Sequence, residues 1–224
     1  YEHLKVAESL GNIAALNQLG LYYKNIVKDN ELAIKYFEMA ANYDYPYAFN
    51  NLGMIYEKEN NYQRAFSYYI KSASLEESWS SNKVGEFYRT GILGKRDWAL
   101  AFHYYNKALE VPKKLQNNYA KYNLAKYFYL NGCYEIGIEK NTSLALGLLE
   151  EAFQTGIMVA GIELVICLTR SYFESSDEAI MKRIEQLLVK IEQHPDYSEK
   201  TKELVEKNIM IVKKGEKIDR NLFQ

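Results

Sequence analysis

The sequence predicts an all-α fold, a right-handed α-solenoid of stacked antiparallel helical hairpins with about eleven helices. Three observations lead to this prediction. Small residues recur along the chain at spacings of 33, 32 and 40 residues. A second pattern, an Asp or Asn four residues before an alanine, recurs between them. Finally, only 12 Gly and 3 Pro in 224 residues argue against a turn-rich β fold.

The first helix of each predicted hairpin, the A helix, carries a small residue followed three residues later by an aromatic one. A glycine costs about 1 kcal/mol relative to alanine inside a helix. A glycine at this position therefore indicates that the partner helix approaches closely and offsets the cost by packing. The small residues are Gly20, Gly53, Gly85 and Ala125, and the aromatic residues are Tyr23, Tyr56, Tyr88 and Phe128.

The second helix of each hairpin, the B helix, carries an alanine followed by a bulky pair three and four residues later. Together with a small residue at offset seven, these positions form one helical face. A residue that can cap a helix N-terminus stands four positions before each alanine. The capping residues are Asp29, Asn61, Asp97 and Asn141, and the bulky pairs are Tyr36-Phe37, Tyr68-Tyr69, Tyr104-Tyr105 and Leu148-Leu149.

These patterns predict a single α-solenoid domain over residues 1–224. Its repeats are 12–44, 45–76, 77–111 and 116–156, followed by a divergent repeat at 157–194. In the divergent repeat Val165 takes the place of the small residue, and Ser175 stands where a capping residue is expected. Residues 1–11 match the end of a preceding repeat, so we expect that the chain is part of a longer protein. Residues 196–224 are predicted to be a C-terminal capping helix and tail.

The connections between A and B helices differ in length. Two of them are long, and we expect residues 93–96 and 133–140 to be exposed surface insertions. In repeat proteins such insertions lie along one face, which is often the binding face.

Several stretches of the chain resemble the Sel-one-like repeat, a relative of the tetratricopeptide repeat. The resemblance covers four units, although the first two have short connections without glycine that are nearer to the tetratricopeptide geometry. It implies an adaptor or scaffold that binds other proteins, and it carries no catalytic residues. The matching residues are Asn51-Leu52-Gly53 with Tyr56, Tyr88-Arg89-Thr90-Gly91 with Asp97 and Ala101, and Ala40-Ala41.

Composition argues against several other classes of function. A formal net charge of −1 gives no electrostatic reason to bind nucleic acid or an anionic membrane. The longest uncharged apolar run, 156–162, is too short to span a membrane. Cys133 and Cys167 form no disulfide framework or zinc motif, which favours free thiols in a reducing, cytoplasmic compartment. The three histidines stand far apart without metal-ligand spacing, so we expect neither an enzyme nor a cofactor.

The expected partner is a protein or an extended peptide, bound in a concave groove lined by the A helices. An Asn amide has a donor and an acceptor side by side and can pair with one peptide unit. One register, three residues before each small position, holds Asn17, Asn50, Asn82 and Tyr122, and the adjacent register holds Asn51 and Asn123. One turn further along the A helices, Lys24, Glu57 and Arg89 mix charges, which suits a polar peptide of mixed charge.

Alternatives remain open at this point. Asn51 and Asn123 also fit a structural role, as hydrogen bonds between repeats. The chain could be the sensing half of a larger regulator or enzyme whose effector domain lies upstream. It could also be a structural repeat that self-associates through the open ends of its stack.

Overall fold

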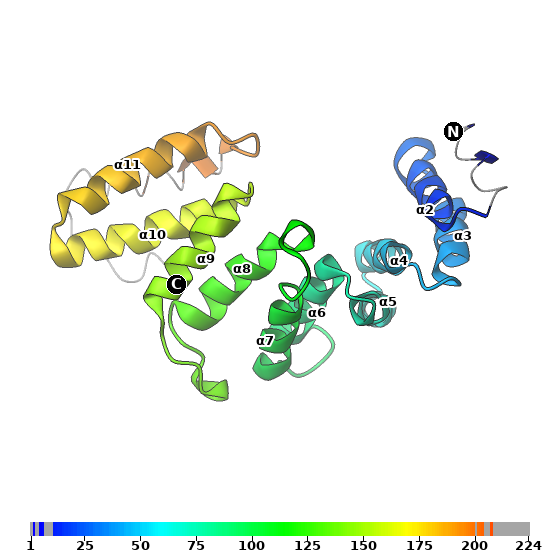
Figure 1. Ribbon diagram of the computed structural model, residues 1–224, viewed down its shortest axis with the longest axis horizontal. Coiled ribbons are helices and arrows are strands. Elements are labelled where there is room, and N and C mark those ends of the chain that lie inside the picture. The colour runs from blue at the N-terminus through cyan, green and yellow to red at the C-terminus, as the bar shows by residue number, and fades with distance from the viewer. Residues whose placement is uncertain (1, 3–4, 7–10, 200, 204–206, 208–224) are drawn as a thin grey trace. The chain divides into compact units, whose positions relative to one another are not determined.

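The computed structural model describes the chain except for residues 1, 3–4, 7–10, 200, 204–206 and 208–224 (Figure 1). Within the described residues the chain is helical, with no strand beyond one isolated bridge between Cys133 and Ile138. The all-α prediction is confirmed. The predicted segment 1–11 and the predicted cap at 196–224 lie largely outside the described residues.

The chain divides into two compact units, Tyr1–Ala120 and Lys121–Gln224. In the first unit, the A helices α2, α4 and α6 alternate with the B helices α3, α5 and α7 (Figure 1). Their bounds are α2 Ile13–Tyr22 with the π-helical turn η1 Tyr23–Val27, α3 Asn30–Ala41, α4 Pro46–Lys58, α5 Tyr62–Ser74, α6 Ser78–Thr90 and α7 Trp98–Lys107. Each of these A helices packs on the B helix that follows it, and α3 and α5 each pack on the next A helix.

The unit boundary falls inside helix α8, Asn118–Leu124. The second unit continues with the π-helical turn η3 Ala125–Tyr129, then α9 Thr142–Gln154, α10 Met158–Ser175 and α11 Glu178–Glu192. Short 3-10 turns η2 Lys113–Leu115 and η4 Tyr134–Ile136 lie in the connections. A single domain over 1–224 stays a prediction.

The predicted caps of the first four B helices are confirmed. In each, the side-chain oxygen accepts a hydrogen bond from the backbone N–H three residues later, which satisfies a free donor of the first turn. The N···O distances are 2.9 Å at Asp29, 3.3 Å at Asn61, 2.9 Å at Asp97 and 3.0 Å at Asn141.

The predicted cap of the fifth B helix is wrong. Asp177, not Ser175, accepts from the N–H of Ala179, at 2.8 Å. Helix α10 continues to Ser175, whose hydroxyl donates to the carbonyl of Ser171. The chain then turns at Ser176 in the left-handed region, with φ 54°, and Asp177 becomes the residue just before the helix.

The glycines of the A helices lie against aromatic rings of the B helices, as predicted. A Cβ atom added at Gly20 would lie 2.5 Å from the Phe37 ring. At Gly53 it would lie 2.4 Å from the Tyr69 ring, and at Gly85 2.7 Å from Tyr105. In the fourth repeat Ala125 takes the small position and the aliphatic Leu149 takes the place of the ring, both in one buried cluster.

Stacked pairs use six of the 21 tyrosines. In the first three repeats the aromatic residue of the A helix stacks on the first residue of the bulky pair of its B helix. The ring centroids are 5.3 Å apart in Tyr23–Tyr36, 5.5 Å in Tyr56–Tyr68 and 5.8 Å in Tyr88–Tyr104. Offset stacking of this kind adds to the apolar burial and fixes how the two helices sit together.

The two long connections differ in how far they are exposed. Residues 93–96 are exposed, as expected. The expectation is wrong at Cys133, which is only 4% exposed although it begins the second insertion. There the backbone N–H of Cys133 donates to the carbonyl of Ile138 at 2.8 Å, and the return bond is 3.0 Å. This bridge folds the loop back and buries Cys133, while Tyr134 at its tip remains exposed.

Candidate functional site

The first asparagine register is used for packing between repeats. Asn17 is only 4% exposed, and its Oδ1 accepts a hydrogen bond from Nδ2 of Asn51 at 2.9 Å. This bond joins the first A helix to the second. The expectation that the Asn17 amide is available to a partner is therefore wrong, because stacking of the A helices buries it. The structural alternative for Asn51, a bond between repeats, is confirmed.

The remaining members of these registers are also engaged or buried. Asn50 donates from Nδ2 to Oε2 of Glu77 at 3.2 Å, so its expected availability is wrong as well. The same Glu77 oxygen accepts from the N–H of Ser80 at 2.6 Å and caps α6. Asn82 and Asn123 are buried. The half-buried Tyr122 accepts from Nζ of Lys126 through its hydroxyl at 3.0 Å. The structure thus forms no exposed ladder of amides from these residues.

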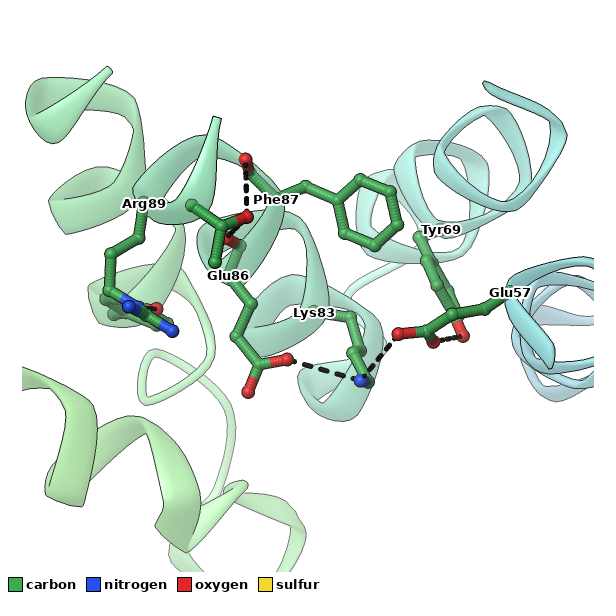
Figure 2. A network of polar contacts seen from close by, with 8 residues as sticks. Glu57, Tyr69, Lys83, Glu86, Phe87 and Arg89 are labelled. Carbon is green, nitrogen blue, oxygen red and sulfur yellow. Dashed lines mark hydrogen bonds and ion pairs between the residues drawn. The ribbon is translucent and has the colours of Figure 1, made fainter. Parts of the chain in front are cut away.

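Two residues of the second register, Glu57 and Arg89, contact the aromatic residues that cover the glycines. Glu57 accepts from the hydroxyl of Tyr69 at 2.7 Å, as Figure 2 shows. In the next repeat, Nε of Arg89 donates to the hydroxyl of Tyr105 at 3.2 Å. Because the corresponding ring in the first repeat is Phe37, Lys24 has no hydroxyl to contact there. Lys24 makes no hydrogen bond or ion pair with any residue that the structure describes.

Glu57 is further held by a lysine from the third repeat. Nζ of Lys83 lies 3.1 Å from Glu57 and 3.2 Å from Glu86, between the two carboxylates (Figure 2). Burial lowers the pKa of Lys83, but Glu86 and Glu57 outweigh burial and raise it above its usual value. Burial and the bond to Glu57 also raise the pKa of Tyr69, which keeps its hydroxyl protonated. The charge of Glu57 is therefore satisfied within the protein.

Three successive A helices, α2 through its turn η1, α4 and α6, line a groove of about 750 Å³ in the first unit, together with Asn30 at the start of α3. This volume lies within the range of small-molecule and cofactor sites. Lys24 and Glu57 are the members of the predicted site that line it, and Arg89 is not among its lining residues. Its lining also includes Asn25 and Lys28 after α2, Met54, Lys58 and Glu59 on and after α4, and Trp79 and Lys83 on α6.

The first wall of the groove depends on an irregular helix end. Helix α2 passes into the π-helical turn η1, which ends at Lys28 in the left-handed region with φ 65°. Single π-helical turns are frequent at functional sites. The sequence gives no signal of this turn, which explains why Asn25 and Lys28 were missed.

At Lys24 the groove carries a positive charge that no carboxylate among the described residues balances. Burial lowers the pKa of Lys24, and the nearby charge of Lys58 lowers it further. Lys58 and Lys28 are exposed and likewise form no ion pair within the described part of the chain. Met54, 38% exposed, and the half-buried Trp79 add apolar surface beside these lysines. The arrangement can hold an anionic group next to an apolar one.

The residues that the structure describes include no candidate metal site and no candidate membrane-spanning helix. No group of three His, Cys, Asp or Glu side chains there could hold a metal ion. None of the helices in the described residues is both long enough and apolar enough to cross a membrane. Cys133 and Cys167 are free thiols and buried, and burial together with Glu163 raises the pKa of Cys167 to about 11.

The fold and groove define an α-solenoid repeat protein, and the repeats identify its family. The family model "Sel1 repeat" matches residues 12–42, 46–76, 80–110 and 118–154. These segments make up more than half of the chain, which therefore belongs to the Sel1 repeat family. Sel1 repeats generally mediate interactions between proteins.

Two solved structures share the fold. The first is c5321 of uropathogenic Escherichia coli, a protective antigen with an SLR fold; the identity is 20% and the TM-score 0.74. The alignment covers 97% of this chain but only 45% of c5321, so the chain spans about half the length of that protein. The second is a Sel1 repeat protein from Oxalobacter formigenes, with 21% identity, a TM-score of 0.68, and coverage of 96% and 93%. A search of curated proteins finds no match.

Proposed function

We propose that this chain is a non-catalytic adaptor or scaffold module that binds an extended segment of a partner protein in the groove of α2, α4 and α6. The family supports a protein partner. The observation that carries the proposal is the groove itself, because three consecutive repeats contribute to it. An extended peptide can contact each repeat in turn, which is how solenoids use their inner helices.

The polar and apolar lining supports a peptide rather than a nucleic acid. A nucleic acid would need a consistent basic stripe along the surface. Here Glu57 and Glu59 interrupt the lysines, and Met54 and Trp79 offer contacts to side chains. A cytoplasmic location, a regulatory role within a larger protein and self-association stay predictions.

A selection experiment tests the proposal. Random 12-residue peptides displayed on phage are selected on the purified chain, and the affinities of the selected peptides are measured by fluorescence anisotropy. The variant Met54→Arg fills the groove with a bulky charged side chain. Leu100→Arg is the matched control, because Leu100 is 37% exposed, close to the 38% of Met54, and lies outside the groove.

The proposal predicts that the selected peptides bind the wild type and Leu100→Arg with equal affinity and do not bind Met54→Arg. Circular dichroism checks that both variants keep their helical content. Peptides that bind all three proteins alike would place the interaction elsewhere, and a selection without binders would contradict peptide binding by this chain.

A further inference from the structure

We infer that the groove binds an acidic peptide segment, one Asp or Glu carboxylate of which is held by both Lys24 and Lys58. The inference rests on the proposed function and names the chemistry of the partner. Its basis is charge complementarity within a defined groove, because both lysines line it and neither is matched by a carboxylate of the described residues.

The position of Lys24 is unfavourable in the unbound chain. Its side chain is half buried, which removes part of the water around the ammonium group. The adjacent Lys58 adds repulsion between like charges. A half-buried cation normally has an anionic partner, since an unpaired buried charge is costly. An incoming carboxylate would relieve both the loss of water and the repulsion.

The carboxylates already present in the groove do not serve this role. Glu57 is engaged by Lys83 and by the Tyr69 hydroxyl, on the side of the third repeat. Glu59 is exposed beyond the end of α4 and forms no ion pair with a described residue. Lys28 adds a third positive charge at the same wall. The side of the groove formed by the first two repeats is thus the basic side.

The apolar side chains that line the groove indicate a second property of the partner peptide. Met54 stands on α4 together with Lys58, and Trp79 stands one repeat further on. Trp79 is half buried, with the ammonium of Lys83 5.2 Å from its ring centroid. A peptide that places an acidic residue at Lys24 and Lys58 would therefore carry an apolar or aromatic residue nearby for Met54 and Trp79. We expect an acidic segment with interspersed apolar residues.

The test begins from the displayed random 12-residue peptides described above. The expected result is that the selected peptides are enriched in Asp and Glu relative to the unselected library. A synthetic copy of the most enriched peptide is then titrated into four proteins. They are the wild type, Lys24→Gln/Lys58→Gln, Lys58→Glu, and the control Lys35→Gln/Lys95→Gln. The control removes the same charge from two exposed lysines of the first unit that lie outside the groove.

The inference predicts that Lys24→Gln/Lys58→Gln raises the Kd about tenfold or more, as expected for loss of charge-assisted contacts. Lys58→Glu should raise it further, whereas the control should stay within about twofold, because exposed charges outside the groove are screened. Replacing the acidic residues of the peptide by Asn or Gln should weaken binding to the wild type by a similar factor. Because Lys58 is exposed, Lys58→Glu is expected to fold even if the Lys24 variant does not.

The possible failures are distinguishable. Selected peptides that need the groove, as shown by loss with Met54→Arg, but that are not enriched in Asp and Glu would overturn the acidic inference and leave the proposed function standing. Acidic peptides that bind the Lys24→Gln/Lys58→Gln variant as well as the control would also overturn it. The absence of any groove-dependent peptide would overturn both proposals.

Discussion

The half-buried Lys24 of the first unit has no carboxylate partner among the described residues, whereas the half-buried Lys126 of the second unit has one, as Lys83 does in the first. In the second unit, Nζ of Lys126 lies 2.8 Å from Glu163, and Nζ of Lys121 lies 2.8 Å from Glu151. Burial lowers the pKa of Lys126, but Glu163 and the Tyr122 hydroxyl raise it above its usual value. In the first unit, Lys24 has its pKa lowered and no carboxylate among the described residues. The repeat can therefore supply a partner to a half-buried lysine, and the lack of one at Lys24 is not required by the fold.

The units also close their hairpins with different packing. The first three repeats use a glycine beneath a ring, whereas the fourth uses Ala125 with Leu149. The second unit has a largely aliphatic core that includes Leu164, Ile184 and Ile191. The comparison shows that this contact can be filled in two ways, by a glycine beneath an aromatic ring or by an alanine with a leucine.

The largest expected effect on stability comes from a variant that disrupts the contact between a glycine and an aromatic ring. Gly20→Ala places a methyl group 2.5 Å from the buried Phe37 ring, so the ring or the helix must move. We expect a loss of about 2 kcal/mol of stability, typical of overpacking in a core. Urea unfolding followed by circular dichroism measures it. The control Gly147→Ala has open space around the new methyl and should instead gain about 0.5–1 kcal/mol from helix propensity.

A second-site change sharpens the same comparison. The double variant Gly20→Ala/Phe37→Leu installs in the first repeat the pair that the fourth repeat uses, Ala125 with Leu149. It should recover at least half of the stability lost in Gly20→Ala, because the smaller aliphatic side chain makes room for the methyl. A double variant less stable than Gly20→Ala would show that the two packing solutions are not interchangeable.

The next effect concerns the ring hydroxyl that only some repeats have. Tyr69→Phe removes the bond to Glu57 while keeping the ring, and Phe37 shows that a phenylalanine fits this contact. We expect a loss of about 1 kcal/mol, the usual net value of such a bond. Tyr43→Phe, at a tyrosine that is 66% exposed, is the control and should be neutral. Equal stabilities of Tyr69→Phe and wild type would mean that Glu57 is held by Lys83 alone.

The same hydroxyl predicts a dependence on alkaline pH. The folded state raises the pKa of Tyr69 through burial and the bond to Glu57. Above pH of about 10 the hydroxyl ionises in the unfolded chain but stays protonated in the folded one. Its contribution to stability is therefore complete below that pH and decreases as the pH rises. Unfolding free energies measured between pH 9 and 11 should fall more steeply for the wild type than for Tyr69→Phe.

The smallest effects compare the lysines themselves. Lys126→Gln leaves Glu163 without its cation and should cost about 0.5–1 kcal/mol after solvent screening. Lys24→Gln should be neutral or slightly stabilising, because it removes a half-buried charge next to Lys58. Thermal unfolding of both variants at neutral pH measures the difference. A destabilised Lys24→Gln variant would indicate that Lys24 has a structural role after all.

The parts of the fold that the sequence predicts are those set by local spacing. The capping residues of the first four B helices and the glycine–ring contacts depend on positions within one hairpin, so they follow from helical periodicity. The bond between Asn17 and Asn51 depends on how one A helix rotates against the next, which spacing does not determine. For the same reason spacing alone predicts that Asn17 and Asn50 lie on an open surface. In the structure both side chains form hydrogen bonds to the next repeat.

The candidate site was predicted only in part. Lys24 and Glu57 were found because they share a register, yet the register does not reveal that Glu57 is satisfied by Tyr69 and Lys83. Lys58 stands 34 residues from Lys24, and their proximity comes from the packing of α2 with its π-helical turn beside α4. Pairwise charge contacts between repeats require the three-dimensional structure.

The central claim is that the basic side of the groove, between the first two repeats, receives an acidic segment. Its most direct test is an amide chemical-shift map of the isotopically labelled chain during titration with the selected acidic peptide. The account predicts that the largest shifts fall on residues 24–30, 54–59 and 79–83, the segments that line the groove. Shifts concentrated in the second unit, or on α5, α7 and the part of α3 beyond Asn30, would contradict it.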